Sequence, residues 1–352
     1  MLILAVNCGS TSTKLAVFKD LELIEKSTIS HSAEYLKQFD KATEQLEFRL
    51  SALKSFLASS EIDLSQLDCI VARGGLLPPI SSGGYVIDDA MMDALLYHPI
   101  RDTHSNLAGI IANKIACELN IPAYIYDGVT TDEMIPIAKY SGIKGVDRYS
   151  HQHTLNTRMM VKEVASELNI PYEEGTFIAA HMGGGTSVNI HHKGRIIDTI
   201  TAEGGAFTPE RCGGLQGDTY TKLVETKGID FVKKQLHGRG GLVSYFGTSS
   251  VKELEEKIEK DPEVTNVLQA MMYQTAKSIG ALATTVNGKV DAIVLTGGLA
   301  NSERLMNWLA DRVSFLAPVI VKPGEHEMEA LARGAYRIMN GDEKAKSLKD
   351  IK

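Results

Sequence analysis

One short pattern occurs at two distant places in the sequence, and it constrains the fold more than any other feature. At each place an apolar run enters a turn of Gly, Ser or Thr, and a second apolar run follows. The first copy is AVNCGSTSTKLAVF at 5–18, and the second is FIAAHMGGGTSVNI at 177–190. Small polar turns between apolar runs are typical of β-hairpins. The repeat therefore predicts an internal duplication, with one α/β domain beginning at each hairpin.

The first turn differs from the commonest phosphate-binding loop. A Walker A loop reads G-x-x-x-x-G-K-[ST] and opens a helix. Here the second glycine is absent between Gly9 and Lys14, and Leu15 stands where Ser or Thr is required. We instead expect both turns to direct backbone N–H groups and hydroxyls into one cleft between the two domains. Two unrelated hairpins with small turns are the alternative.

The rest of the chain alternates between predicted strands and helices, which favours an α/β fold. The predicted domains are 1–147 plus 330–352 and 148–329, and the last helix is expected to pack back on the first domain. A third glycine site, Gly297-Gly298, follows an apolar strand and precedes a helix, an arrangement that lets backbone approach a nucleotide. The main expected helices are 33–59, Ser105–Leu119 with Ser105 as its cap, Thr157–Leu168, Asn301–Val313 and Glu327–Met339.

Composition excludes several classes of function. The net charge of −7 over 352 residues argues against non-specific nucleic-acid binding. The four cysteines form no C-x-x-C pair, which argues against zinc and redox motifs and suits a reducing compartment. No run approaches the ~20 apolar residues that a membrane-spanning helix needs. We therefore expect a cytoplasmic protein without nucleic-acid or membrane partners.

Eight motifs occur in order along nearly the whole chain, and they are NCGSTSTK, VARGGLLPP, THSNLAG, HTLN, AHMGGGTSV, FTPER, LTGGLA and PGEHEMEALA. Together they resemble the motifs of the acetate and butyrate kinase family. This family belongs to the actin/Hsp70/sugar-kinase superfold, in which ATP lies between duplicated ribonuclease H-like domains. The chain length and the segments RGGLLPP and FTPER resemble the butyrate-type members most.

The resemblance implies a reaction and its cofactors. The ATP γ-phosphoryl group would pass in line to the carboxylate of butyrate, isobutyrate or a similar acid, giving an acyl phosphate and ADP. ATP and Mg²⁺ are the implied cofactors, and a homodimer is implied as well. A carboxylate is already ionised at neutral pH, so the nucleophile needs no general base. Catalysis then depends on positioning and on charge neutralisation.

The resemblance also implies roles for single residues. Arg73 would bind the substrate carboxylate through two parallel hydrogen bonds. Arg211, assigned by neighbourhood within FTPER, would bind the phosphoryl oxygens. His153 and His181 match the family histidines at the transferring phosphoryl group and at the phosphate turn. Asp127 resembles the aspartate that holds Mg²⁺.

The remaining implied site residues bind metal or nucleotide. Glu327 resembles the family's metal-organising glutamate, with Glu325 and Glu329 as close competitors. Gln152 stands where related chains usually carry an aromatic residue that lines the acyl pocket. The residues implied for the phosphates and adenosine of ATP are Asn7, Ser10, Thr11, Ser12, Lys14, His181, Gly183, Gly184, Gly185, Thr186, Gly297 and Gly298.

Three alternatives stay open. The first is an acetate, propionate or branched-chain acid kinase, because pocket volume decides between acids and the sequence does not give it. The second is an ATP-binding sensor or filament protein of the actin/Hsp70 type. The third is a sugar kinase, which needs a base to deprotonate a hydroxyl. Asp127 could be that base.

Overall fold

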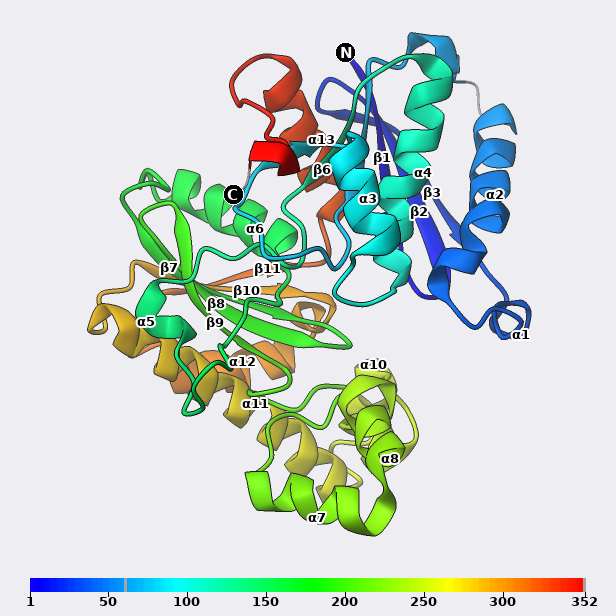
Figure 1. The fold of residues 1–352 in the computed structure, drawn as a ribbon. Helices are drawn as coiled ribbons and strands as arrows, with labels where there is room; N and C mark the ends of the chain where they lie inside the picture. The colour runs from blue at the N-terminus through cyan, green and yellow to red at the C-terminus, as the bar shows by residue number, and fades with distance from the viewer. Residues whose placement is uncertain (60–61, 351–352) are drawn as a thin grey trace. The chain divides into compact units, whose positions relative to one another are not determined.

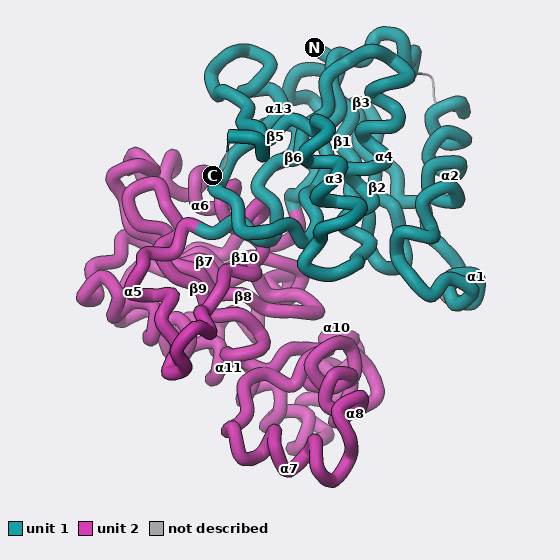
Figure 2. The backbone as a smooth tube through the Cα atoms, in the orientation of Figure 1, with its two compact units in different colours: residues 1–132, 326–352 teal, residues 133–325 magenta. Residues whose placement is uncertain are grey.

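The computed structural model describes residues 1–59 and 62–350, and they form two compact units (Figure 2). Unit 1 comprises residues 1–132 and 326–352, and unit 2 comprises residues 133–325. These divisions fall earlier in the chain than the domain boundaries predicted from the sequence, 147/148 and 329/330, which stay predictions. Among the described residues no helix is long and apolar enough to cross a membrane.

Unit 1 is built on a six-stranded sheet in the order β3-β2-β1-β4-β6-β5 (Figure 1). The first three strands form antiparallel pairs, and β4 and β6 run parallel to β1. The β-strands alternate apolar side chains toward a core shared with α4, while α13 also contacts β1 and β4. The strands are β1 (Leu2–Cys8), β2 (Ser12–Lys19), β3 (Glu22–Ser30), β4 (Cys69–Arg73), β5 (Gly84–Val86) and β6 (Ala123–Tyr126).

The helices of unit 1 confirm some predictions and contradict others. The last helix, α13 (Glu327–Met339), has the predicted bounds and packs on the sheet of unit 1. The others are α1 (Ala33–Leu36), α2 (Leu46–Ser59), α3 (Asp89–Tyr97) and α4 (His104–Leu119), with 3₁₀ turns at Ala42–Gln45, Leu64–Gln66 and Leu348–Asp350.

The single long helix predicted over 33–59 is wrong. The chain leaves α1 after Leu36 and re-enters a helical turn only at Ala42. The Glu44 carboxylate accepts hydrogen bonds from the backbone N–H groups of Asp40 (2.9 Å) and Lys41 (3.2 Å). The N–H groups of Ala42 (2.7 Å) and Thr43 (3.5 Å), which start the second helical segment, donate to the Asp102 carboxylate, so the break is stable.

The predicted cap of α4 is also wrong. The helix begins at His104, with Thr103 as the N-cap residue, so Ser105 lies inside the first turn. The Thr103 hydroxyl pairs with the Ser105 hydroxyl at 2.9 Å and makes no side-chain bond to the helix N–H groups.

Unit 2 repeats the strand order of unit 1. Its sheet runs β11-β10-β7-β8-β9, so an antiparallel β7-β8-β9 meander is again extended by a parallel strand beside its first strand. The predicted duplication is therefore confirmed at the level of topology. The strands are β7 (Thr176–Met182), β8 (Thr186–His192), β9 (Arg195–Thr201), β10 (Ala292–Gly297) and β11 (Val319–Pro323).

Helices cover this sheet and form an insertion after β9. Apolar residues of α11 and α12 build the main core against β7, β8 and β10. Residues of α6 pack with β7 and β10 in a second cluster. The helices are α5 (Pro136–Lys139), α6 (Thr154–Glu167), α7 (Gly217–Lys227), α8 (Ile229–Lys234), a π-type turn (Gln235–Arg239), α9 (Leu242–Phe246), α10 (Val251–Glu255), α11 (Pro262–Ala283), α12 (Glu303–Val313) and 3₁₀ turns at Thr284–Val286 and Gly298–Asn301.

Candidate active site

Three site residues predicted from the sequence meet in unit 1. Asn7 lies near the end of β1, Arg73 ends β4, and Glu327 begins α13. The Asn7 side-chain amide donates to Glu327 Oε2 at 2.6 Å. The Arg73 guanidinium contacts both carboxylate oxygens of Glu327 at 3.4 Å. Because β1 and β4 are parallel, their carboxyl ends share one edge of the sheet, where α/β proteins place their ligands.

These contacts distinguish Glu327 from its neighbour Glu329 within unit 1. Glu327 is buried and bonded to Asn7 and Arg73. Glu329 instead forms an ion pair with Lys26 at 3.6 Å. Glu325 belongs to unit 2, where one of its oxygens lies 4.0 Å from the position of a Cβ added at Gly183. Of the two glutamates of unit 1, Glu327 is the one that the structure places beside Arg73.

Asn7 presents an unsatisfied acceptor beside this carboxylate. Its Nδ2 donates to Glu327, so the amide is oriented, and its buried Oδ1 has no hydrogen-bond partner among the described residues. A buried acceptor without a donor is costly unless an ion, a water or a ligand completes it. Carboxylate and amide oxygens are hard ligands that suit Mg²⁺. The Asn7–Glu327 pair therefore fits a magnesium ion or its bound water.

Asp127 is held in a strained conformation at the end of β6. Its φ angle is +41°, in the left-handed region, and its side chain is buried. Asp127 Oδ1 accepts from the Gly83 N–H at 2.8 Å, and the Asp127 N–H donates to the Gly83 carbonyl at 3.3 Å. The turn thus fixes the carboxylate. Among the described residues, no group of three or more His, Cys, Asp or Glu side chains is arranged to hold a metal. A metal here would need ligands from its substrate.

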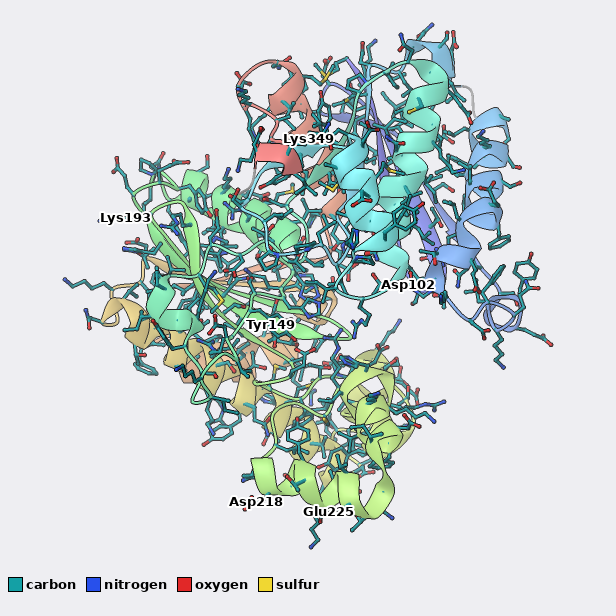
Figure 3. The ribbon with its side chains drawn as sticks, in the orientation of Figure 1. Asp102, Tyr149, Lys193, Asp218, Glu225 and Lys349 are labelled. Atoms are coloured by element: carbon teal, nitrogen blue, oxygen red, sulfur yellow. The ribbon has the colours of Figure 1, made fainter. Side chains whose placement is uncertain are left out.

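The hydroxyl turn of unit 1 connects β1 to β2. The Gly9 N–H donates to the Ser12 carbonyl at 2.8 Å, which closes the turn, and Lys14 pairs with Asn7 across the hairpin. Ser10 and Thr11 line a pocket of about 580 Å³. The opposite lining comes from segment 36–45 and from Arg101, Asp102 and His104, which lie at the start of α4. Figure 3 labels Asp102.

Two histidines stack in unit 2. The rings of His153 and His181 lie 4.0 Å apart at an angle of 14°. Asn156 Nδ2 lies 2.9 Å from His181 Nδ1. An amide nitrogen only donates, so this bond assigns the acceptor role to Nδ1 and the proton of the neutral ring to Nε2. His153 Nδ1 pairs with the Ser187 hydroxyl at 2.9 Å.

The glycine turn lies next to His181 Nε2. A Cβ added at Gly183 would sit 3.8 Å from that nitrogen. The Gly183 N–H donates to the Gly185 carbonyl at 2.9 Å, and Thr186 begins β8 directly after the turn. The Thr208 hydroxyl donates to the Gly184 carbonyl at 2.5 Å. The turn is therefore anchored to the segment that carries Arg211.

Arg211 packs directly on the glycine turn. A Cβ at Gly185 would lie 2.7 Å from Arg211 Cζ, so a side chain at this position would displace the guanidinium from the turn. Glu203 approaches Arg211 NH1 at 3.7 Å, a distance at which the charge is balanced without a short hydrogen bond. The structure thus brings Arg211 to the predicted phosphate turn of its own unit.

The third glycine site, Gly297-Gly298, lies next to Met182, where the glycine turn of unit 2 begins. Gly297 has φ +91°, and a Cβ there would lie 2.4 Å from the Met182 carbonyl oxygen. Only glycine allows β10 to end this close to the end of β7. Gly298 is exposed, and a Cβ added there would meet none of the described atoms within 4 Å.

Sequence reasoning missed residues that orient the site. Asn156 fixes the His181 ring, Ser187 fixes His153, and Arg49 bonds to the hydroxyl turn. The motif HTLN contained Asn156, so its spacing from His153 along α6 was the available signal. Gln152 is buried and bonded to Asn189 (2.6 Å) and Ser150 (3.1 Å) inside unit 2.

Comparison with known proteins finds one matching family model and several solved structures with a similar fold. The model of the acetokinase family matches residues 131–328. The structure is similar to that of acetate kinase from Porphyromonas gingivalis, with TM-score 0.76 and 19% identity over 95% of this chain and 98% of that one.

Two further structures resemble this chain at low identity. They are a propionate kinase from Francisella tularensis subsp. tularensis SCHU S4 (TM-score 0.73, 17% identity, 95% of this chain and 98% of that one) and a ROK family protein from Streptococcus pneumoniae TIGR4 (0.52, 12%, 97% and 100%). At these identities the likeness shows the fold alone, and it confirms the predicted actin-like pair of α/β domains.

Proposed function

The chain belongs to the acetokinase family, and on that premise we propose that it is a carboxylate kinase whose preferred substrate is butyrate. The γ-phosphoryl group of ATP passes in line to a carboxylate oxygen, the bond to the β-phosphate oxygen breaks, and ADP leaves. The reaction is reversible. The observation that most supports this proposal is the cluster of Asn7, Arg73 and Glu327. The Arg73 guanidinium is a cation that can bind the acid, and the unsatisfied Asn7 Oδ1 beside it can bind the metal or its water.

Arg73 is proposed to bind the acid. Its guanidinium already meets both oxygens of one carboxylate, Glu327, although both contacts are long at 3.4 Å. A substrate carboxylate would take shorter parallel bonds to the same planar group. Because the acid is ionised, none of these residues has to act as a base, and the role of Arg73 is to hold the nucleophilic oxygen in position.

The residues of unit 2 are proposed to bind the phosphates. His181 Nε2–H, the Gly183–Gly185 backbone and Arg211 donate hydrogen bonds to phosphoryl oxygens, and His153 contacts the transferring group. Charge spreads over these oxygens during phosphoryl transfer, and fixed donors and cations stabilise it. Gly297 and Gly298 would flank the adenosine.

Magnesium would be held by few protein ligands. Glu327 and Asn7 Oδ1 fit the ion or its water, Asp127 is the second carboxylate, and Ser10, Thr11, Ser12 and Lys14 would line the phosphate end. Mg²⁺ keeps waters and takes one or two carboxylates together with substrate phosphates. When bound, it neutralises charge on the phosphates.

The preference for butyrate rests on the sequence. RGGLLPP and FTPER resemble butyrate-type members, as does the chain length. Acetate, propionate or a branched acid are alternatives within the same chemistry, and the similar structures include an acetate kinase and a propionate kinase.

A homodimer is part of the proposal. Large apolar side chains are exposed along the segment from α5 toward α6, and a partner surface would cover them. They include Ile137 (76% exposed), Tyr140 (78%), Ile143 (67%) and Tyr149 (65%).

ADP formation tests the class of reaction. We would measure it with MgATP alone, with short aliphatic acids, and with hexoses. A carboxylate kinase releases ADP only when an acid is present. Release with hexoses alone would favour a sugar kinase, which the ROK-like fold also permits. Release that ignores every acceptor would favour an ATP-binding sensor.

A further inference from the structure

Arg49 on α2 is a wholly buried cation. Its side chain has 0% exposure and is among the largest fully buried side chains described. Arginine is almost never buried this far without a carboxylate partner. Yet its hydrogen bonds in the described structure go to neutral groups, which are the oxygens of Gln45, Ser12, Thr13 and Ser10 and the Cys8 thiol. The nearby Cys8 thiol brings no negative charge, because burial raises its pKa to about 11.

Those oxygens belong mainly to the hydroxyl turn. Arg49 donates to the carbonyls of Ser10 (2.9 Å) and Ser12 (3.0 Å), and to the Thr13 hydroxyl (3.2 Å). Its Nε donates to the Gln45 side chain at 3.0 Å, which fixes the guanidinium plane. The turn therefore rests on one planar group that reaches it from α2.

The Thr11 carbonyl of the turn also has a partner from within unit 1. The Thr11 carbonyl accepts from the His31 N–H at 2.8 Å. In a trans peptide the C=O and the N–H of the next residue point in opposite directions. With the Ser10 carbonyl bound to Arg49, the Thr11 N–H points away from Arg49. The described structure gives this N–H no acceptor, and Thr11 lines the 580 Å³ pocket.

We propose that Arg49 is a positioning residue that makes the Ser10–Thr11 turn bind anions. It holds the carbonyls inward, so that the Thr11 N–H and the turn hydroxyls are left for a ligand. Its uncompensated charge also makes the potential at the turn positive. The ligand is a phosphate group, which supplies the negative charge that Arg49 lacks in the protein. The pocket lining carries the cations Lys37, Lys41 and Arg101 and the carboxylates Asp40 and Asp102, so its cations outnumber its carboxylates by one. The identity of the phosphate as that of ATP or of the acyl phosphate rests on the proposed function.

The test compares Arg49→Met and Arg49→Lys with Leu53→Ala. Leu53 lies one turn further along α2 and is equally buried, so its truncation weakens the same helix without touching the turn. Binding of inorganic phosphate and of MgADP is measured by calorimetry, kcat and KM for ATP by ADP release, and stability by urea unfolding.

We expect Arg49→Met to weaken phosphate binding and kcat/KM for ATP by about ten- to a hundredfold, as expected for lost hydrogen bonds to a charged group. Arg49→Lys keeps the charge but loses the planar set of guanidinium donors. Its phosphate affinity and its kcat/KM for ATP should therefore lie between those of Arg49→Met and the wild type. Leu53→Ala should lower stability and leave both quantities within about twofold, because the turn is untouched.

The proposal would be overturned if Arg49→Met bound inorganic phosphate with the same affinity as Leu53→Ala. Should Arg49→Met not fold, Arg49→Lys carries the test, and unchanged binding in that variant together with an unchanged KM for ATP would overturn it. A wild-type protein that phosphorylates no acid but binds phosphate through Arg49 would refute the proposed function and leave this inference standing.

Discussion

Replacing Arg73 by methionine is the most informative single perturbation of unit 1. The change removes the cation that pairs with Glu327 and keeps a side chain of similar length. The Arg73 side chain is 22% exposed and that of Glu327 is 9% exposed. The Glu327 carboxylate would then be left with Asn7 as its remaining partner from the cluster.

The expected magnitudes follow from this geometry. At 3.4 Å two unit charges attract by about 5 kcal/mol at an effective dielectric constant of 20. Solvent reaches Arg73, and separating the charges in the unfolded chain restores their hydration, so the net loss of stability should be only about 1–2 kcal/mol. Transition-state binding of the acid loses a bidentate charged contact, which is worth about 3–4 kcal/mol or roughly a hundred- to a thousandfold in kcat/KM.

The assay is steady-state acyl phosphate formation with the acid and ATP varied separately. We expect kcat/KM for the acid to fall by that factor, KM for ATP to change little, and Arg73→Lys to recover part of the loss. Arg333→Met, an exposed position of the same helix as Glu327, is the matched control and should behave as wild type. An unchanged kcat/KM for the acid in Arg73→Met would refute the assignment.

Three further predictions concern unit 2. Gly185→Ala places a Cβ 2.7 Å from Arg211 Cζ, so we expect kcat to fall at least about tenfold as the guanidinium is displaced. Burial, together with two nearby cations, holds the pKa of His191 well below its usual value, so the folded state keeps this ring neutral. Its contribution to the free energy of unfolding is full above the unfolded pKa of about 6.5 and is lost as the pH falls below it, which urea unfolding between pH 8 and 5 measures. Tyr140→Asp charges an exposed apolar segment, and we expect size-exclusion chromatography with light scattering to show a dimer that dissociates.

Each of these has a distinct control. Gly217→Ala meets no atom within 4 Å and should leave kcat unchanged; equal activity of Gly185→Ala would contradict the packing of Arg211. His191→Asn should flatten part of the pH dependence of stability, and an unchanged slope would show that His191 does not cause it. A dimer of Tyr140→Asp as stable as that of the wild type would place the interface elsewhere.

The duplicated hairpins explain why the fold could be predicted from the sequence. Two small polar turns between apolar runs specify local structure, and the parallel strands that follow have few alternatives in an α/β sheet. The break after Leu36 could not be predicted in the same way, because it is stabilised by two carboxylates, Glu44 and the distant Asp102, and the fold brings the second one to the break. The N-cap of α4 is Thr103 and not the predicted Ser105 for a similar reason, because the Thr103 and Ser105 hydroxyls bind each other.

The candidate site was only partly accessible to sequence reasoning. Arg73 stands out in the sequence because it ends a predicted strand directly before two glycines, and Glu327 because it begins the last predicted helix. Their pairing across 254 residues depends on the tertiary fold. Nothing in the sequence marked Arg49 as a buried residue of the site, since an arginine in an amphipathic helix normally lies on the solvent side. Its burial becomes visible only when α2 packs against the hydroxyl turn.

The most direct test is a chain-length series. Acyl phosphate formed from MgATP is trapped with hydroxylamine for acetate, propionate, butyrate, isobutyrate and valerate, and kcat/KM is determined for each acid. We predict hydroxamate formation with a maximum at butyrate. A maximum at another acid would refute the butyrate preference, and no hydroxamate with any acid, despite MgATP binding, would contradict the carboxylate kinase itself.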